Sequence, residues 1–316
     1  MKLMIRNCMN MRKNMILSYT LALFVIFIWS VTFVSTKTLL EYLSPTEILF
    51  YRYAIAYFLF FAASPKIMWP LNFRDEVKFA IAGFLGVTLY FLCENFALLY
   101  STASNVSLLV STAPMLTGLV AHFMTKNEKI TANFIKGCFF GLAGVFLIVF
   151  NGHFLLKLNP IGDVLAIAAA LSFAFYSIII RDFNCSFYSA AVITRKTFFY
   201  SLLSLIPLLF TPLFEWEPDL LMKGRVMGHL LFLGIFASAL CFLFWNKVIW
   251  KLGAVRANNL IYLLPPMSMI SAAVVLHERI TVFAAAGGLL ILLGVYLSQK
   301  RVPGPEKDPG TSEETE

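Results

Sequence analysis

Charged residues are scarce in this sequence. Only 13% of its 316 residues are Asp, Glu, Lys or Arg, whereas 59% are apolar, a balance far outside that of soluble globular domains. The polar stretch at 301–316, which ends in PGPEKDPGTSEETE, is typical of a disordered tail. The scarcity of charge elsewhere excludes an ordinary soluble protein and indicates a protein that lies in a lipid bilayer.

Catalytic and metal-binding patterns are also missing. The four histidines are isolated, and the sequence has no HExxH, GxSxG or GxxxxGK[ST] pattern, so we expect no enzymatic activity. The five cysteines are widely separated and include no CxxC pair, so we expect no disulfide, no metal site and no cofactor. No small-residue cleavage site follows the basic segment 1–16, which predicts an anchored first helix rather than a removed signal peptide.

Apolar stretches are what the sequence has in abundance. Each is about 20 residues long, which is enough to cross the hydrocarbon core as a helix. The ten expected spans are 17–39, 46–64, 77–99, 103–125, 132–152, 160–180, 189–210, 227–249, 255–276 and 282–299. We therefore predict an all-α membrane protein with ten transmembrane helices.

The positive charges sort by side of the membrane. With the N-terminus inside, most of the 25 Lys and Arg residues fall on the cytoplasmic side, as the positive-inside rule requires. This distribution predicts a multi-pass protein of the cell (plasma or inner) membrane with both termini in the cytoplasm. The net charge of +8 then reflects orientation in the membrane, and we expect no nucleic-acid partner.

The two halves of the chain resemble each other. The matched residues include Gly137 with Gly287, Gly144 with Gly294, Asn95 with Asn246, Gly86 with Gly234 and Pro114 with Pro265. Each half holds five expected spans, and this odd number makes the second half enter the membrane from the opposite side. We therefore predict two inverted five-helix repeats, 17–152 and 160–300, an architecture associated with secondary transporters.

Several repeated residues have local interpretations. Thr131 and Thr281 precede helices and are predicted N-caps. Pro114 and Pro265 lie inside expected spans and are predicted to bend them. Gly137 forms a GxxxG pattern with Gly141, which favours close helix packing.

A glutamate interrupts the third expected span. Its predicted small-residue face contains Gly83, Gly86, Tyr90, Glu94 and Ala97, whereas the bulkier Phe84, Phe91 and Leu98 are expected on the opposite side. We expect Glu94 to point into the helix bundle. Two interpretations stay open. Glu94 is either a structural residue near the outer end of its span, or a functional one that exchanges a proton or contacts a substrate amine.

Other residues are candidates for lining a cavity or for gating it. The aromatic candidates are Trp29, Tyr90, Tyr176, Trp245 and Tyr262, and Ser111 lies on a hydroxyl-bearing face of the fourth span. Asn95 and Asn246 are interpreted either as helix-to-helix hydrogen-bond partners or as substrate contacts. Arg52 and Arg195 either extend toward the nearer membrane surface or act as gating or charge residues.

The order of these features resembles the EamA-type branch of the drug/metabolite transporter superfamily. The resemblance is carried by Trp29 of IWSVTFVSTKTLL, Arg52 of SPTEILFYRY, TASNVSLLVSTAPMLTGLVA, EKIT, FWNKVIWKLGA, the proline of NNLIYLLPPM, and ERIT. It implies export or exchange of small metabolites such as amino acids or drugs, by alternating access through a central cavity. It also implies that spans one, three, four, six, eight and nine line this cavity.

Glu94 departs from the family pattern. The family more often has an aromatic or other uncharged residue there, as the second half has Trp245, so no family role carries over to this carboxyl group. A channel and a non-transporting scaffold or receptor are the alternatives to a transporter. The sequence leaves the substrate, the direction of transport, proton coupling and homodimer formation open.

Overall fold

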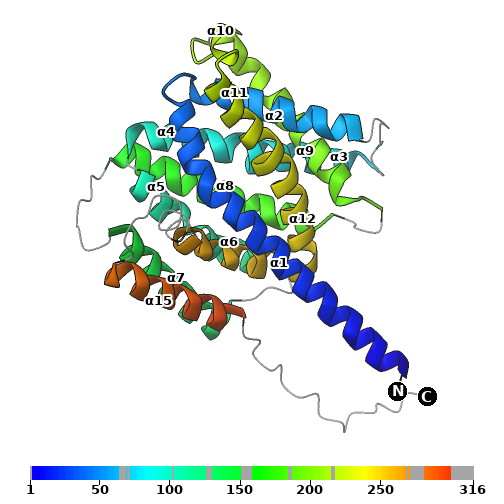
Figure 1. Ribbon diagram of the computed structural model, residues 1–316. Helices are drawn as coiled ribbons and strands as arrows, with labels where there is room; N and C mark the ends of the chain where they lie inside the picture. Colours follow the sequence, from blue (N-terminus) through cyan, green and yellow to red (C-terminus); the bar gives the residue numbers. More distant parts are fainter. Residues whose placement is uncertain are drawn as a thin grey trace.

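The computed structural model is helical, with no strand among the residues that it describes (Figure 1). These residues are 2–63, 69, 72–101, 103–125, 130–150, 159–183, 187–214, 218–267, 270 and 281–299. The expected tail 301–316, the first two residues of EKIT, the first three of ERIT, and residues 151–158 between the repeats lie outside them.

Both halves of the chain contribute helices to one bundle. The first half contains α1 (Lys2–Leu39), α2 (Pro45–Ala63), α3 (Phe73–Gly83), η1 (Phe84–Leu89), α4 (Tyr90–Tyr100), α5 (Ala103–Val110), α6 (Ala113–Met124) and α7 (Ala132–Phe150). The second half contains α8 (Pro160–Arg181), α9 (Ala190–Leu205), η2 (Ile206–Phe210), α10 (Pro218–Leu221), α11 (Gly224–Leu231), η3 (Phe232–Leu240), α12 (Cys241–Leu252), α13 (Ala254–Asn259), η4 (Leu260–Leu263) and α15 (Val282–Gln299). Because α1 begins at Lys2, residues 2–16 of the basic N-terminal segment are continuous with the first helix.

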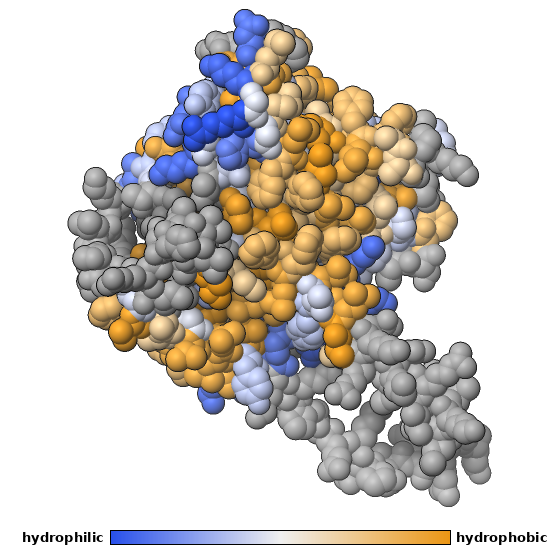
Figure 2. Space-filling model, viewed as in Figure 1, coloured by the Kyte–Doolittle hydropathy of each residue, from blue (hydrophilic) through white to orange (hydrophobic). Residues whose placement is uncertain are grey.

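Seven helical segments in the described residues are long and apolar enough to cross a membrane. They are Met15–Leu39, Pro45–Ala63, Phe73–Tyr100, Ala132–Val149, Pro160–Arg181, Ala190–Phe210 and Gly224–Leu252, and shorter apolar helices accompany them. Figure 2 shows a broad apolar area over the middle of one face. Large apolar side chains such as Phe139 and Leu289 are more than two-thirds exposed, and such exposure is favourable in hydrocarbon but unfavourable in water.

The fourth expected span is divided into two helical segments, α5 and α6. Helix α5 ends at Val110, a turn follows at Ser111 and Thr112, and α6 begins with Pro114 in its first turn. Proline is well tolerated there because its missing N–H has no partner within the helix. Pro114 thus lies just after an irregular turn in the span, and the bend that we expect at this proline stays a prediction. In the second half, Pro265 is buried and lies two residues after the end of the 3₁₀ turn η4.

The third and eighth expected spans each contain a π-helical segment. Segment η1 separates α3 from α4, and η3 separates α11 from α12. The matched residues Gly86 and Gly234 lie within these segments. A Cβ atom on Gly234 would lie only 2.6 Å from Ile55 of α2, and one on Gly86 would overlap the Tyr176 ring of α8. The two π segments are thus in corresponding places, each in close contact with the other repeat.

The last helices of the two repeats, α7 and α15, pack side by side (Figure 1). A Cβ atom on Gly294 would lie 2.6 Å from the Gly141 nitrogen and 2.7 Å from the Gly137 oxygen. Gly144 meets Gly287 in the same way, so the start of α7 lies against the end of α15 and the helices are antiparallel. The predicted close packing of Gly137 and Gly141 is confirmed, and so is the Thr131 cap, whose hydroxyl accepts from the Phe134 N–H at 3.1 Å.

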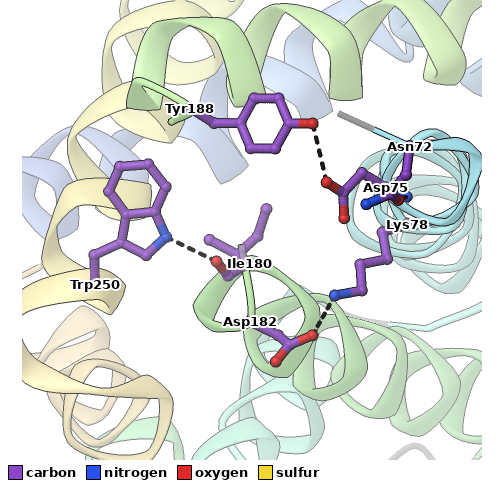
Figure 3. Close-up of polar contacts among 7 residues, drawn as sticks. All are labelled: Asn72, Asp75, Lys78, Ile180, Asp182, Tyr188 and Trp250. Atoms are coloured by element: carbon purple, nitrogen blue, oxygen red, sulfur yellow. Dashed lines mark hydrogen bonds and ion pairs between the residues drawn. The ribbon is translucent and has the colours of Figure 1, made fainter. Parts of the chain in front are cut away.

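Polar contacts join four helices at one end of the bundle (Figure 3). The Tyr188 hydroxyl before α9 donates to Asp75 of α3 at 3.0 Å. Lys78 of α3 pairs with Asp182 at the end of α8. The Trp250 indole of α12 donates to the Ile180 carbonyl of α8 at 2.8 Å. This end of the bundle is therefore closed by direct contacts between α3, α8, α9 and α12.

The glycine contact between α7 and α15 predicts a matched pair of variants. Gly294→Ala places a methyl group against backbone atoms that cannot move aside, and we expect a loss of roughly 1–3 kcal/mol, seen as a lower melting temperature in detergent. Gly288→Ala in the same helix meets nothing within 4 Å and should melt at or above the wild-type temperature. Equal melting of the two variants would show that this contact is not tight.

Candidate functional site

A pocket lies between the two repeats. Its walls come from α1, α2, α4, α5, α6, α8, α12, η4 and the residue after η4. The lining residues are Trp29, Thr32, Arg52, Tyr90, Phe91, Glu94, Val110, Ala113, Phe173, Phe242, Ile261 and Leu264. The six spans that the family resemblance implied supply all of these residues except Arg52. The pocket is thus mostly apolar and aromatic, with one basic residue, Arg52, and one acidic residue, Glu94, in its lining.

Arg52 turns into this pocket rather than toward a membrane surface. Its side chain is 1% exposed. The Nε–H donates to the Ser238 hydroxyl of η3 at 3.0 Å, and the guanidinium carbon lies 4.2 Å from the centre of the Phe91 ring. A buried cation requires such compensation, because placing it in hydrocarbon costs about 2.5–3.5 kcal/mol or more. The hydrogen bond and the cation–π contact supply part of it.

Glu94 is the acidic residue of the pocket and is 6% exposed. The Tyr90 hydroxyl interacts with its carboxyl group, and the Arg52 charge attracts it. Its Oε2 atom has no hydrogen-bond partner among the described residues. An unsatisfied buried acceptor of this kind costs roughly 1–3 kcal/mol, and more when it is charged. Glu94 can therefore bind a proton or a hydrogen-bond donor that enters the pocket.

Aromatic rings hold the rest of the wall in place. Trp29 of α1 packs against Trp245 with ring centroids 5.1 Å apart, and its indole N–H donates to the Ala237 carbonyl of η3 at 3.1 Å. Tyr90 contacts the Phe91 and Phe173 rings at 4.6 and 5.3 Å between centroids. The pocket thus offers flat apolar surfaces beside its two charged groups.

The π segments accept hydrogen bonds from neighbouring helices. In η3, Ala237 and Ser238 accept from the pocket residues Trp29 and Arg52. In η1, the Leu85 carbonyl accepts from the Ser172 hydroxyl at 2.6 Å, and the Val87 carbonyl accepts from the Tyr53 hydroxyl at 3.0 Å. A π turn changes the i→i+4 pattern of the helix, and here side-chain donors from other helices meet its backbone.

Several candidates from the sequence do not line this pocket. Of its candidates, Trp29, Arg52, Tyr90 and Glu94 line the pocket, but Asn95, Ser111, Tyr176, Arg195, Trp245, Asn246 and Tyr262 do not. All seven are buried. Trp245 packs behind Trp29, and Tyr262 contacts Gly141 of α7.

The paired asparagines have different surroundings. Asn246 accepts from the Tyr176 hydroxyl at 2.7 Å and donates to the Thr194 hydroxyl at 2.9 Å, so it links α12 with α8 and α9. Neither amide atom of Asn95 has a hydrogen-bond partner in the part of the chain that the structure describes. The helix-to-helix interpretation therefore fits Asn246, whereas Asn95 does not share its bonding pattern.

Eight of the twelve lining residues were not found by sequence reasoning. The missed residues are Thr32, Phe91, Val110, Ala113, Phe173, Phe242, Ile261 and Leu264. The expectation that Phe91 lies on the side opposite to Glu94 was wrong. The spacing of Phe91 and Glu94 could have predicted this, because residues i and i+3 of a helix are neighbours. Nothing in the sequence distinguished Phe173 and Phe242 from the other phenylalanines, since the chain has 32 Phe.

Comparison with known proteins accounts for both halves of the chain. The model of the EamA-like transporter family matches residues 16–150 and matches again at 160–299. An uncharacterized transporter of Archaeoglobus fulgidus is 28% identical over 280 residues, which are 88% of this chain and 96% of that protein. A probable amino-acid metabolite efflux pump of Escherichia coli is 26% identical, over 88% of this chain and 93% of that protein.

A solved structure has the same fold. A crystal structure of a protein at 20% sequence identity superimposes with a TM-score of 0.68, covering 89% of this chain and 96% of that one.

The asparagine pair predicts opposite effects on stability. Asn246→Leu leaves the Tyr176 hydroxyl without its acceptor, and we expect a loss of about 1–2 kcal/mol, measured as a lower melting temperature in detergent. Asn95→Leu removes an amide with no described partner, so its melting temperature should be unchanged or higher. A larger loss for Asn95→Leu than for Asn246→Leu would contradict this assignment.

Proposed function

The chain belongs to the EamA-like transporter family, and from this premise we propose that it exports or exchanges small metabolites by alternating access through the pocket. The observation that carries the proposal is the burial of Arg52 and Glu94 in one pocket between the two repeats. Intramembrane charges that face a bundle interior are typical of substrate and ion pathways.

Alternating access requires the closed end of the bundle to open. Lys78 precedes Tyr90 by 12 residues, which is about 18 Å along a helix, so the contacts of Figure 3 lie well away from the pocket. In the proposed cycle, α3, α8, α9 and α12 part at this end while the opposite end closes. The proposed topology has ten spans in two inverted repeats, with both termini and this end in the cytoplasm. The antiparallel contact of α7 with α15 supports this topology.

The proposed substrates are amino acids or similar zwitterions. Arg52 and Glu94 bring a balanced pair of charges to the pocket, and an ion pair within the ligand would keep that balance in a low-dielectric site. Aromatic walls suit an apolar side chain. The similarity to a probable amino-acid metabolite efflux pump agrees with this class.

Glu94 has the role of binding the substrate amine or a coupled proton. Its unpartnered Oε2 supports this role, because an acceptor already satisfied by the protein would gain nothing from a ligand.

Counterflow in proteoliposomes tests the transport function. Vesicles loaded with one unlabelled amino acid at a time should accumulate the same labelled amino acid in a saturable manner. Linear, non-saturating flux would indicate a channel instead. Absence of flux across a broad panel of amino acids and other metabolites would favour a non-transporting scaffold or receptor.

Glu94→Gln tests the carboxyl group with little change in shape. We expect uptake driven by a pH gradient to fall about tenfold or more, because a charge-assisted hydrogen bond is lost, while the melting temperature stays near that of the wild type. Glu41→Gln, in an exposed turn, is the matched control and should transport normally. Unchanged transport by Glu94→Gln at every pH would remove Glu94 from the mechanism.

A further inference from the structure

The Arg52 side chain is held from two directions. Its Nε–H bonds to the Ser238 hydroxyl at 3.0 Å, and Phe91 covers the face of the guanidinium group at 4.2 Å. A planar group with one edge bonded and one face covered has little rotational freedom left. The Nε bond leaves the four terminal N–H donors, whose fork geometry matches the two oxygens of a carboxylate.

Ser238 takes part in the pocket only through Arg52. Its side chain is 0% exposed, and it is not one of the residues that line the pocket. It lies in η3, next to Ala237, whose carbonyl accepts from Trp29. Consecutive residues of one π segment therefore orient the cation and an aromatic wall of the pocket.

The corresponding π segment of the first repeat has no such role. Segment η1 accepts from Ser172 and Tyr53, and neither of these donors lines the pocket. Two buried serine hydroxyls, those of Ser172 and Ser238, are thus hydrogen-bonded at a π segment, and of these two Ser238 contacts a pocket charge. This difference makes Ser172 a control for Ser238.

We propose that Ser238 is a positioning residue that sets selectivity for carboxylate-bearing substrates by orienting the Arg52 guanidinium. The inference rests on the proposed function, in which the pocket binds the transported molecule. The carboxylate of the substrate bonds to the terminal nitrogens of Arg52, and its amine lies toward Glu94. Without the Ser238 hydroxyl, the guanidinium rotates about its side-chain bonds and the bidentate geometry is lost, although the charge stays in place.

Binding of two matched probes to the purified full-length protein tests this role. L-phenylalanine has both an amine and a carboxylate, whereas phenethylamine has the same ring and amine but no carboxylate. We expect Ser238→Ala to weaken phenylalanine binding about tenfold, as the loss of one well-oriented charged contact does. Phenethylamine, the weaker ligand of the wild type, should bind equally to both.

Two further variants separate positioning from folding. Ser238→Thr keeps the hydroxyl and should retain phenylalanine binding, and Ser172→Ala should leave the binding of both probes unchanged. The melting temperature of every variant in detergent identifies any that has lost its fold. A similar loss for both probes in Ser238→Ala, or an equal effect of Ser172→Ala, would overturn the proposal.

The wild-type protein itself separates this inference from the proposed function. If it binds neither probe, the proposed carboxylate site is wrong. Saturable counterflow of any other metabolite would then still support transport, whereas the absence of all counterflow would count against the transport function as well.

Discussion

A guanidinium group and a carboxyl group lie in one pocket among apolar helices, and each is costly there without compensation. Arg52 is compensated by Ser238, Phe91 and the attraction of Glu94. Glu94 has only partial compensation, because one of its oxygens has no described partner. The requirement to stabilise this pair accounts for the contacts around it, and it leaves an acceptor for whatever enters the pocket.

The backbone of the surrounding helices meets a second constraint, since lipid supplies no hydrogen bonds. Both π segments depart from the regular helical pattern, and side-chain donors from α1, α2 and α8 bond to their carbonyl groups. Gly86 and Gly234 allow the partner helices to come this close. The same close approach that satisfies the backbone also aligns Trp29 and Arg52, so packing between the repeats determines the shape of the pocket.

The candidate site was predicted in part, for reasons that differ by residue type. Arg52 and Glu94 are rare charges in apolar runs, which made both of them candidates, but for Arg52 the sequence left open an orientation toward the membrane surface. Phe173 and Phe242 could not be distinguished from the many other phenylalanines. Tyr176 and Trp245 were predicted to line a cavity, but a neighbouring helix or ring covers each of them.

The sequence by itself determined the helical membrane architecture, the internal repeat and the presence of charged residues within apolar runs. Composition and periodicity are sufficient for these features, because lipid allows few backbone conformations and a repeat is visible as matched residues. Only the tertiary structure decided that Ser111 and Thr112 break the fourth span, that Phe91 faces Arg52, and that Ser238 holds it. These contacts join residues far apart in the chain or depend on where a helix becomes irregular. Local sequence patterns predict neither.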